Sequence, residues 1–138
     1  MANLTATCPC CNTEKNESEF YAHKARSTGR SAHCKVCTRE SRNEYRKKNP
    51  DIIRNNNYNF MYGISLEDYN KMFLNQNGCC AICKKHQNEF TKKLAVDHCH
   101  ETGKVRALLC AFCNTSLGNM NDDIELLKSA INYLEKHQ

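Results

Sequence analysis

One short stretch of the chain, residues 94–114, carries the densest set of side chains able to do acid–base or metal chemistry. It reads LAVDHCHETGKVRALLCAFCN and contains Asp97, His98, His100 and Asn114. Mg²⁺ prefers oxygen ligands and keeps several waters, so the carboxylate of Asp97 and the amide of Asn114 form a minimal protein site that a bound phosphate would complete. Imidazole is well suited to take a proton from water near neutral pH, which makes His98 a candidate general base.

Two plainer interpretations of these residues stay open. Asp97, His98 and His100 could form a transition-metal site without catalysis, because carboxylate and imidazole together suit such ions. Alternatively, the two histidines are surface residues with no chemical role.

The elements around these residues follow from local composition. Branched apolar residues near 94–96 and again over 104–109 predict two strands, and Glu101-Thr102-Gly103 between them predicts a turn. A helix is expected after Cys110, so the order is strand, turn, strand, helix, with the four candidate side chains at one end. On a regular strand Asp97 and His98 point to opposite faces, so their joint use requires a break or bulge in the backbone.

The chain contains eleven cysteines, and their spacing predicts two metal sites rather than disulfides. The eight paired cysteines form two Cys₄ sets suited to tetrahedral zinc: Cys8, Cys11, Cys34 and Cys37, then Cys80, Cys83, Cys110 and Cys113. Cys10, Cys79 and Cys99 are left as candidate free thiols. The first residues lack a secretory pattern and no run reaches membrane-spanning length, so a reducing, cytoplasmic setting is expected, which favours zinc.

The second Cys₄ set is expected to have a mechanical role. Cys80 and Cys83 precede the first strand, whereas Cys110 and Cys113 join the second strand to the helix that carries Asn114. Closing this loop through zinc would fix the separation of Asn114 from Asp97. Arg106, on the second strand, is expected to contact phosphate or to pair with Asp97 or Glu101.

With 138 residues, the chain has room for one modest domain or two small ones. Structural metal ions can stabilise domains whose hydrophobic cores are this small. The net charge of +5 is weak evidence for nucleic acid, because two Zn(Cys)₄ centres would reduce it to about +1. The location of the basic residues is more informative: nine Lys or Arg lie between residues 24 and 48, against two acids. A helix capped by Thr38 and ending near Lys48, before Asn49-Pro50, would align three of them in a stripe: Arg39, Arg42 and Arg46.

This stripe could follow a phosphate backbone without reading sequence, or it could simply be a solvated helix face. The sequence therefore divides into a Cys₄ zinc module with a basic helix over residues 1–48, a linker over 49–62 and a second domain over 63–138. The asparagine-rich linker also contains Asp51-Ile52-Ile53, which could extend a helix.

Two further helices are expected in the second domain, in addition to the helix after Cys110. Ser65 and Asp68 resemble a capping box, and apolar residues at helical spacing follow until Asn77-Gly78, so this helix is expected to pack on the strand–strand–helix unit. A C-terminal helix beginning near Asp122 has an apolar stripe of Ile124, Leu127, Ile131 and Leu134. The stripe must be buried against the chain's own core or against another protomer.

The run DHCHETGKVRALLCAFCN, followed by LG and by a helix ending in INYL, resembles the recombination endonuclease VII family of phage and bacterial DNases. The upstream GISLEDYNKMFLNQNGCCAIC is similar to the segment leading into that domain, and the resemblance covers about residues 62–137. The family belongs to the HNH, or His-Me finger, nucleases, whose shared site is a ββα unit. The implied fold is a small zinc-stabilised α+β protein in which a ββα-metal core follows an N-terminal Cys₄ module and helices.

The resemblance also implies roles for the candidate residues. Asp97 and Asn114 would bind a catalytic Mg²⁺ or Mn²⁺, His98 would activate the attacking water, and His100 would support the scissile phosphate. The sequence departs from the usual pattern at Cys99 and Ala107, and at Leu117 where the best-known member has an acid, which removes one carboxylate from the metal shell.

The expected function is that of a metal-dependent DNA endonuclease acting on branched or recombining DNA, in the cytoplasm of the bacterial host if the protein is phage-encoded. DNA is the expected partner, a homodimer through the helices is implied by the resemblance, and no membrane is expected. The alternatives are a site-specific nicking or homing HNH endonuclease, or a catalytically inactive zinc-dependent DNA-binding module, which the loss of an acid at Leu117 favours.

Overall fold

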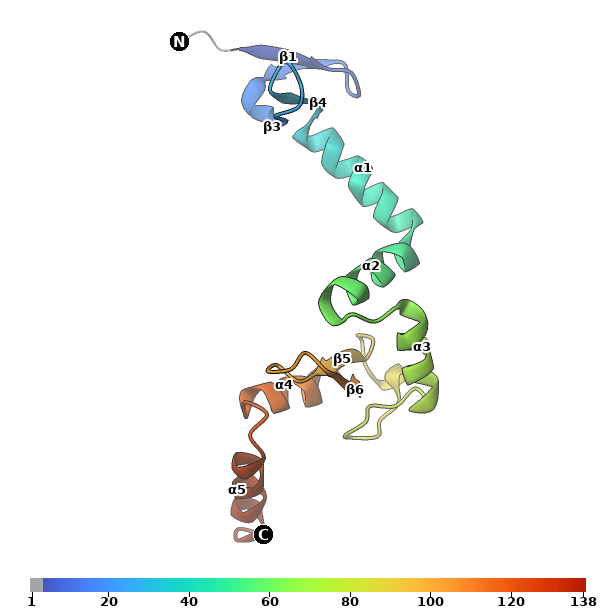
Figure 1. The fold of residues 1–138 in the computed structure, drawn as a ribbon, viewed down its shortest axis with the longest axis vertical. Coiled ribbons are helices and arrows are strands. Elements are labelled where there is room, and N and C mark those ends of the chain that lie inside the picture. The colour runs from blue at the N-terminus through green and yellow to red at the C-terminus, as the bar shows by residue number, and fades with distance from the viewer. Residues whose placement is uncertain (1–3) are drawn as a thin grey trace. The chain divides into compact units, whose positions relative to one another are not determined.

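The structure is a computed structural model that describes residues 4–138. Its elements fall into two units that divide between Ile53 and Arg54. Both units combine short antiparallel hairpins with helices (Figure 1), and each contains one complete set of the paired cysteines. The α+β class expected from the sequence is confirmed.

The first unit contains two small hairpins followed by a helix. Strand β1 (Thr5–Cys8) pairs with β2 (Thr13–Asn16), and after a short 3₁₀ helix (Glu17–Glu19) strand β3 (Phe20–Ala22) pairs with β4 (Arg30–Cys34). The core is small: Phe20 and three of the cysteines are buried, with Ala6 and Val36 packed against them. Sequence analysis missed these four strands, because residues such as TEKN have no apolar alternation from which to predict a strand.

Helix α1 (Lys35–Lys48) begins three residues before the predicted Thr38 cap, which is therefore wrong. Cys34 occupies the N-cap position in extended conformation, and Cys37 lies in the first turn as the buried residue of this helix. The Cys-x₂-Cys pair itself thus forms the first helical turn, since the spacing that brings two thiols to one metal is also the spacing of N-cap and N3. The predicted end near Lys48 is confirmed.

The residues predicted as a linker hold helix α2 (Pro50–Tyr62). Proline is favourable at a first helical position, because it has no N–H to leave unpaired and its φ is already helical. Tyr58 and Tyr62 near the end of α2 pack against the core of the second unit. The functional boundaries at 48 and 63 stay a prediction.

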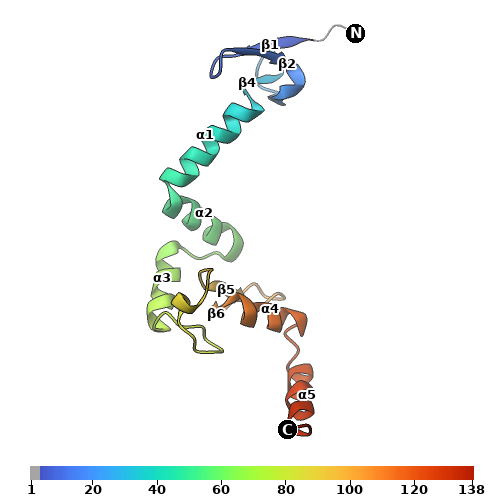
Figure 2. The same cartoon turned by 180° about the vertical axis from the view of Figure 1, so that it is seen from behind.

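The second unit is built around a ββα motif. Strand β5 (Ala95–His98) pairs antiparallel with β6 (Val105–Leu109), and helix α4 (Ala111–Asn119) packs against both, as the two opposite views show (Figures 1 and 2). The predicted order of strand, turn, strand and helix is confirmed. The core beneath it is larger than that of the first unit and includes buried Tyr69, Leu94, Val96, Leu108 and Leu109.

Helix α3 (Leu66–Asn75) supports this hairpin. Its predicted capping box is present: the Ser65 hydroxyl accepts from the backbone N–H of Asp68, and the Asp68 carboxylate accepts from that of Ser65. The hydroxyl of Tyr69 donates to the carbonyl of Leu94 at 2.8 Å. Just beyond the helix, the Gln76 side chain donates to the carbonyl of Leu108 at 2.9 Å and accepts from its N–H at 2.8 Å. These bonds satisfy strand groups that β5 leaves unpaired, so α3 fixes the position of β6.

Helix α5 (Ile124–Glu135) is capped by Asp123, whose carboxylate accepts from the N–H groups of Glu125 and Leu126. The helix thus begins close to the predicted position near Asp122, but its cap is Asp123 and not Asp122, as the acid at that position had suggested. The apolar stripe is largely uncovered within residues 4–138: Ile124, Ile131 and Leu134 are all more than half exposed. No helix of this described part is both long and apolar enough to span a membrane.

Candidate active site and metal centres

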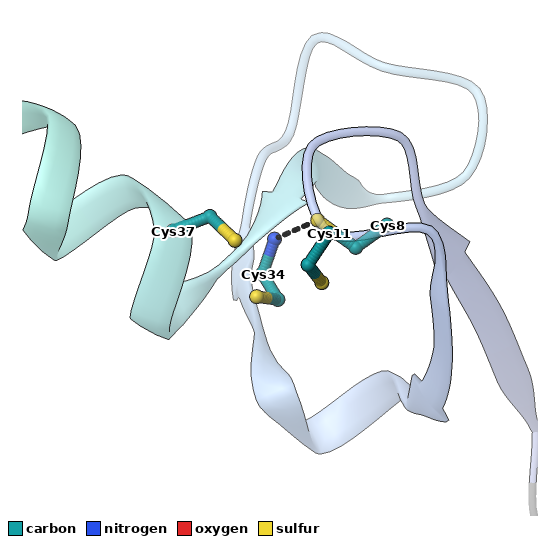
Figure 3. Close-up of side chains that lie close together, drawn as sticks. All are labelled: Cys8, Cys11, Cys34 and Cys37. Atoms are coloured by element: carbon teal, nitrogen blue, oxygen red, sulfur yellow. Dashed lines mark hydrogen bonds between the residues drawn. The ribbon is translucent and has the colours of Figure 1, made fainter.

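Both predicted Cys₄ sets are present as clusters. Within each, the four Sγ atoms lie within 4.8 Å of one another. Figure 3 shows the first set: Cys8 ends β1, Cys11 lies in the turn that follows, Cys34 ends β4 and Cys37 lies in the first turn of α1. In the second set, the Sγ atoms of Cys83 and Cys110 are 3.9 Å apart, close to the edge of about 3.8 Å that a tetrahedron with 2.3 Å Zn–S bonds requires.

The backbone around each cluster favours thiolates. The N–H of Cys34 donates to the sulfur of Cys8 at 3.3 Å, and the N–H of Cys113 donates to that of Cys110 at 3.4 Å. Hydrogen bonding from the Cys34 backbone, with smaller contributions from Cys11 and Cys10, lowers the pKa of Cys8 to about 6. Such preorganised donors are typical of sites that hold a metal through deprotonated sulfur.

The ββα motif contains a cavity of about 270 Å³ at one end of its hairpin. The cavity is lined by residues of β5, β6 and α4 and of the segments next to them: Tyr62, Ala95, Val96, Asp97, His98, His100, Arg106, Asn114, Thr115, Gly118, Asn119 and Asp122. All five residues predicted for this site, including Arg106, therefore lie around one cavity.

A backbone irregularity lets neighbouring residues of β5 share this cavity. Asp97 pairs with Ala107, but His98 pairs with Val105, so the register shifts between the two. The two-residue step on β6 leaves Arg106 as the extra residue, and β5 ends at His98, so the strict alternation that would direct the Asp97 and His98 side chains to opposite faces stops at this point. The ring centre of His98 lies 5.1 Å from that of His100 and 5.3 Å from that of Tyr62, edge-on in both cases.

Asp97 is the most buried charged residue described, with 7% of its surface exposed. Its two carboxylate oxygens accept from Arg106, from Nε at 2.7 Å and from Nη2 at 2.8 Å. Nη2 also donates to the carboxylate of Asp122 at 3.2 Å. The hydrogen bond to Asp97 raises the pKa of Arg106 above its ordinary value. Of the predicted alternatives for Arg106, the structure has the pairing with Asp97 and not that with Glu101.

Four polar residues that line the cavity were not predicted as site residues: Tyr62, Thr115, Asn119 and Asp122. Tyr62 was assigned to a linker, and Asp122 was taken as a helix cap. A signal for Asp122 was available, because two adjacent acids cannot both cap α5 and Asp123 satisfies that role alone.

The donors around the cavity fit a hard divalent cation. Asp97 provides carboxylate oxygens and Asn114 an amide oxygen, the ligand types that Mg²⁺ and Mn²⁺ accept, and Asp122 adds a further negative charge at the cavity. The cavity has room for a partly hydrated ion, since a water occupies about 30 Å³ of liquid. The alternative transition-metal site of Asp97, His98 and His100 fits less well: among residues 4–138, the groups of three or more His, Cys, Asp or Glu with converging ligand atoms are the two Cys₄ sets.

The basic stripe of the first unit is exposed. Arg39, Arg42 and Arg46 all lie on the accessible surface of α1. The guanidinium of Arg42 and the ammonium of Lys35 stand over the ring of Tyr21, with centroid distances of 5.6 and 5.8 Å. Tyr21 is itself 41% exposed, so this face combines cations with an accessible aromatic ring.

A bulged ββα hairpin with a polar cavity and a Cys₄ corner defines a ββα-metal protein. Residues 55–136, more than half of the chain, match the family described as recombination endonuclease VII. The chain belongs to this family, as the residues of the hairpin suggested.

Two curated relatives are similar to this chain, both called gene 59 protein. That of Mycobacterium phage D29 is 49% identical over 76 residues, which are 54% of this chain and 46% of the relative. That of Mycobacterium phage L5 is 47% identical over 74 residues, which are 53% of this chain and 44% of the relative. The match thus spans less than half the length of these relatives. The crystal structure of the ββα-Me type II restriction endonuclease Hpy99I aligns with 97% of this chain and 66% of its own, at 26% identity and a TM-score of 0.42.

Proposed function

We propose that this protein is a divalent-metal-dependent DNA endonuclease whose active site is the cavity of the ββα motif. The observation that carries the proposal is that Asp97 and His98, adjacent at the end of β5 where the hairpin register shifts, line one cavity in a chain of the recombination endonuclease VII family. A carboxylate and an imidazole thus lie beside a cavity that Asn114 also lines, and this combination suits phosphodiester hydrolysis.

Each side chain has a role in this proposal. Asp97 and Asn114 hold a Mg²⁺ or Mn²⁺ ion, which when bound would neutralise charge on the phosphate and on the leaving oxygen. His98 takes a proton from the attacking water, and its edge contacts with Tyr62 and His100 limit the orientations of its ring. His100, which is exposed at the mouth of the cavity, supports the scissile phosphate.

The two Cys₄ clusters are proposed to bind structural zinc, because four thiolates at tetrahedral spacing select that ion. The second zinc holds the corner between β6 and α4. Asn114 directly follows the ligand Cys113, so its position depends on that metal. Function in the cytoplasm of a bacterial host is proposed from the phage origin of the two relatives.

The first unit is proposed to bind the DNA backbone through Arg39, Arg42 and Arg46. These side chains are exposed along α1, and no ion pair within residues 4–138 engages Arg39 or Arg46. Contacts of this kind add salt-sensitive affinity without sequence preference. The type of DNA cut, whether branched, linear or supercoiled, is then determined by the arrangement of such contacts rather than by the ββα motif.

The proposal is tested by incubating zinc-loaded protein with supercoiled plasmid and Mg²⁺ or Mn²⁺. We expect nicking that EDTA stops and that His98→Ala reduces by at least about 100-fold, the usual contribution of a general base. His137→Ala is the matched control, since His137 is in the same unit but outside the cavity, with its ring bonded to the carbonyl of Tyr133. Equal activity of both variants would refute the role of His98.

The same assay separates the alternatives. DNA binding without cleavage under any metal would establish the inactive DNA-binding module instead. Comparing a cruciform with linear duplexes of matched sequence distinguishes a branched-DNA enzyme, which cuts at the junction, from a site-specific nicking or homing enzyme, which cuts one linear sequence.

A homodimer is proposed through α5, because Ile124, Ile131 and Leu134 expose a contiguous apolar stripe with helical spacing. Sedimentation equilibrium of the full chain should give twice the monomer mass. Leu134→Lys should shift the protein to monomer, whereas Lys128→Gln on the same helix should leave the dimer intact. A monomeric wild type would exclude this interface.

A further inference from the structure

The guanidinium of Arg106 lies between two carboxylates inside the proposed active site. It contacts both oxygens of Asp97 and one oxygen of Asp122. The Asp97 side chain is 9% exposed and that of Asp122 is 20% exposed, so both acids are shielded from solvent that would otherwise screen the interaction. The Arg106 side chain is more accessible, at 36%.

The position of Asp122 requires unusual backbone. Asn121 and Asp122 both have positive φ, at 53° and 55°, in the corner between α4 and α5. This conformation is unfavourable for a residue with a side chain, although Asn and Asp tolerate it best. The N–H of Asp122 donates to the carbonyl of Leu117 at 3.0 Å, which holds the corner closed. Capping of α5 does not explain the positive φ of Asp122, because Asp123 is the residue that caps this helix.

A cation at Asp97 and the bound guanidinium compete. Both oxygens of Asp97 accept from Arg106, and a positive charge in bidentate contact repels a divalent ion approaching the same carboxylate. Asp97 and Arg106 alone are neutral, so an ion binding there meets no net attraction. Asp122 adds one negative charge and offers the guanidinium a second partner.

We propose that Asp122 is a positioning residue that holds Arg106 when Asp97 binds the catalytic cation, so that the arginine exchanges one carboxylate for the other. This inference rests on the proposed function. Arg106 then stays at the cavity with its remaining donors free for an anionic phosphate oxygen, which guanidinium recognises well. Without Asp122 the arginine stays on Asp97 and excludes the ion.

The test is Mn²⁺ binding measured by electron paramagnetic resonance on the zinc-loaded full chain without DNA. Asp122→Asn should weaken Mn²⁺ binding about tenfold, within the range of coupling between residues in one ion-pair network. Asp123→Asn is the matched control: it removes the same charge one residue away, at the cap, and should change binding less than about twofold. Asp97→Asn should abolish the site and so locate the signal.

A double variant separates exchange from other roles of Asp122. In an Arg106→Gln background, Asp122→Asn should lose most of its effect, because the arginine that it holds is absent. If Asp122→Asn weakens Mn²⁺ binding equally with and without Arg106, Asp122 acts on the ion directly and the proposal is overturned. If Asp122→Asn changes Mn²⁺ binding no more than Asp123→Asn does, the contact between Arg106 and Asp122 is only structural. That outcome also overturns the proposal.

Two controls keep these outcomes distinct. Circular dichroism must show that each variant is folded. If Arg106→Gln is not, Arg106→Met replaces it, since methionine also removes the charge and keeps a long unbranched side chain that can pack in the same place. A wild-type protein that binds no Mn²⁺ contradicts the proposed function and this inference together, whereas wild-type binding without the coupling contradicts this inference alone.

Discussion

The two units use the same cysteine corner for different purposes. In each, the third cysteine is the N-cap of a helix and the fourth lies in its first turn: Cys34 and Cys37 at α1, Cys110 and Cys113 at α4. The first unit has a small core around Phe20 and leads into a long, basic, exposed helix. The second packs its corner on a larger core and leads into a short helix that carries Asn114 to a cavity.

The difference teaches that this cysteine corner, in which a Cys-x₂-Cys pair forms the first turn of a helix, specifies local geometry but not function. Thr38 and Asn114 occupy equivalent positions, each directly after the fourth cysteine. Asn114 lines a cavity because the irregular β5–β6 hairpin and α4 pack together, and the first unit has no equivalent of that packing among its described residues. What packs against the corner therefore decides whether the following side chain becomes part of a site.

The largest expected effect comes from removing one ligand from either corner. Cys113→Ser should unfold the second unit and abolish cleavage, because structural zinc contributes about 10–16 kcal/mol to folding in small modules. Cys37→Ser should unfold the first unit while the second keeps its fold. Zinc content and ¹H–¹⁵N correlation spectra check both: each variant should lose half of the zinc and only the resonances of its own unit. Loss of both sets of resonances in either variant would show that the units fold together.

A core substitution should affect the second unit selectively. Leu108 is fully buried beneath the hairpin, so Leu108→Ala should lower the free energy of unfolding of this unit by about 2–5 kcal/mol. Urea denaturation followed by tyrosine fluorescence measures the change. Leu74→Ala is the control, since Leu74 is 72% exposed, and it should have little effect. An equal loss in both variants would contradict the described core.

The basic stripe should affect binding rather than chemistry. Replacing Arg39, Arg42 and Arg46 together with Gln should weaken DNA binding about tenfold at moderate salt and reduce the salt slope by up to about three, since each phosphate contact contributes about 0.9. Fluorescence anisotropy over a range of salt concentrations checks this. The matched control replaces three lysines of the second unit with Gln: Lys71, Lys128 and Lys136. A similar loss in the control would assign binding to net charge alone.

The smallest effect concerns the cap of α3. Ser65→Ala should cost about 1 kcal/mol of stability, measured by thermal unfolding, whereas Ser129→Ala on exposed α5 should not. The hydrogen bonds from Ser65 lower the pKa of the Asp68 carboxyl. A lowered pKa in the folded state stabilises the protein above the unfolded-state pKa, and this contribution is lost as the pH falls through the folded-state value. Ser65→Ala should therefore flatten the acid dependence of stability, and an unchanged acid profile would contradict the cap.

Much of the second unit could be predicted because its signals are local. The capping box at Ser65, the turn before Gly103 and the paired cysteines each depend on residues a few positions apart. The break in regular pairing next to Asp97 was a requirement of the chemistry rather than of the sequence pattern, and the structure has it as the register shift opposite Arg106. The start of α1 was misplaced because Thr38 is a better cap by type than Cys34, and the Cys-x₂-Cys turn overrides that preference.

The missed features depend on contacts between distant residues. Arg106 and Asp122 are 16 positions apart, and nothing near either residue predicts their pairing. The hairpins of the first unit likewise consist of short polar strands whose pairing is set by the cysteine cluster. Helix α2 replaces a predicted linker because its tyrosines gain burial that the asparagine-rich composition does not reveal.

The order of the ligands along the chain has a consequence for synthesis on the ribosome. The first cluster is complete once Cys37 has emerged, so its metal can load while most of the polypeptide is still being made. The second cluster waits for Cys113, and the partner of Arg106 follows later still at Asp122. If the two units have the functions proposed above, a nascent chain would complete its DNA-binding unit before its cleavage site, and a translation product arrested between them would bind DNA without cutting it.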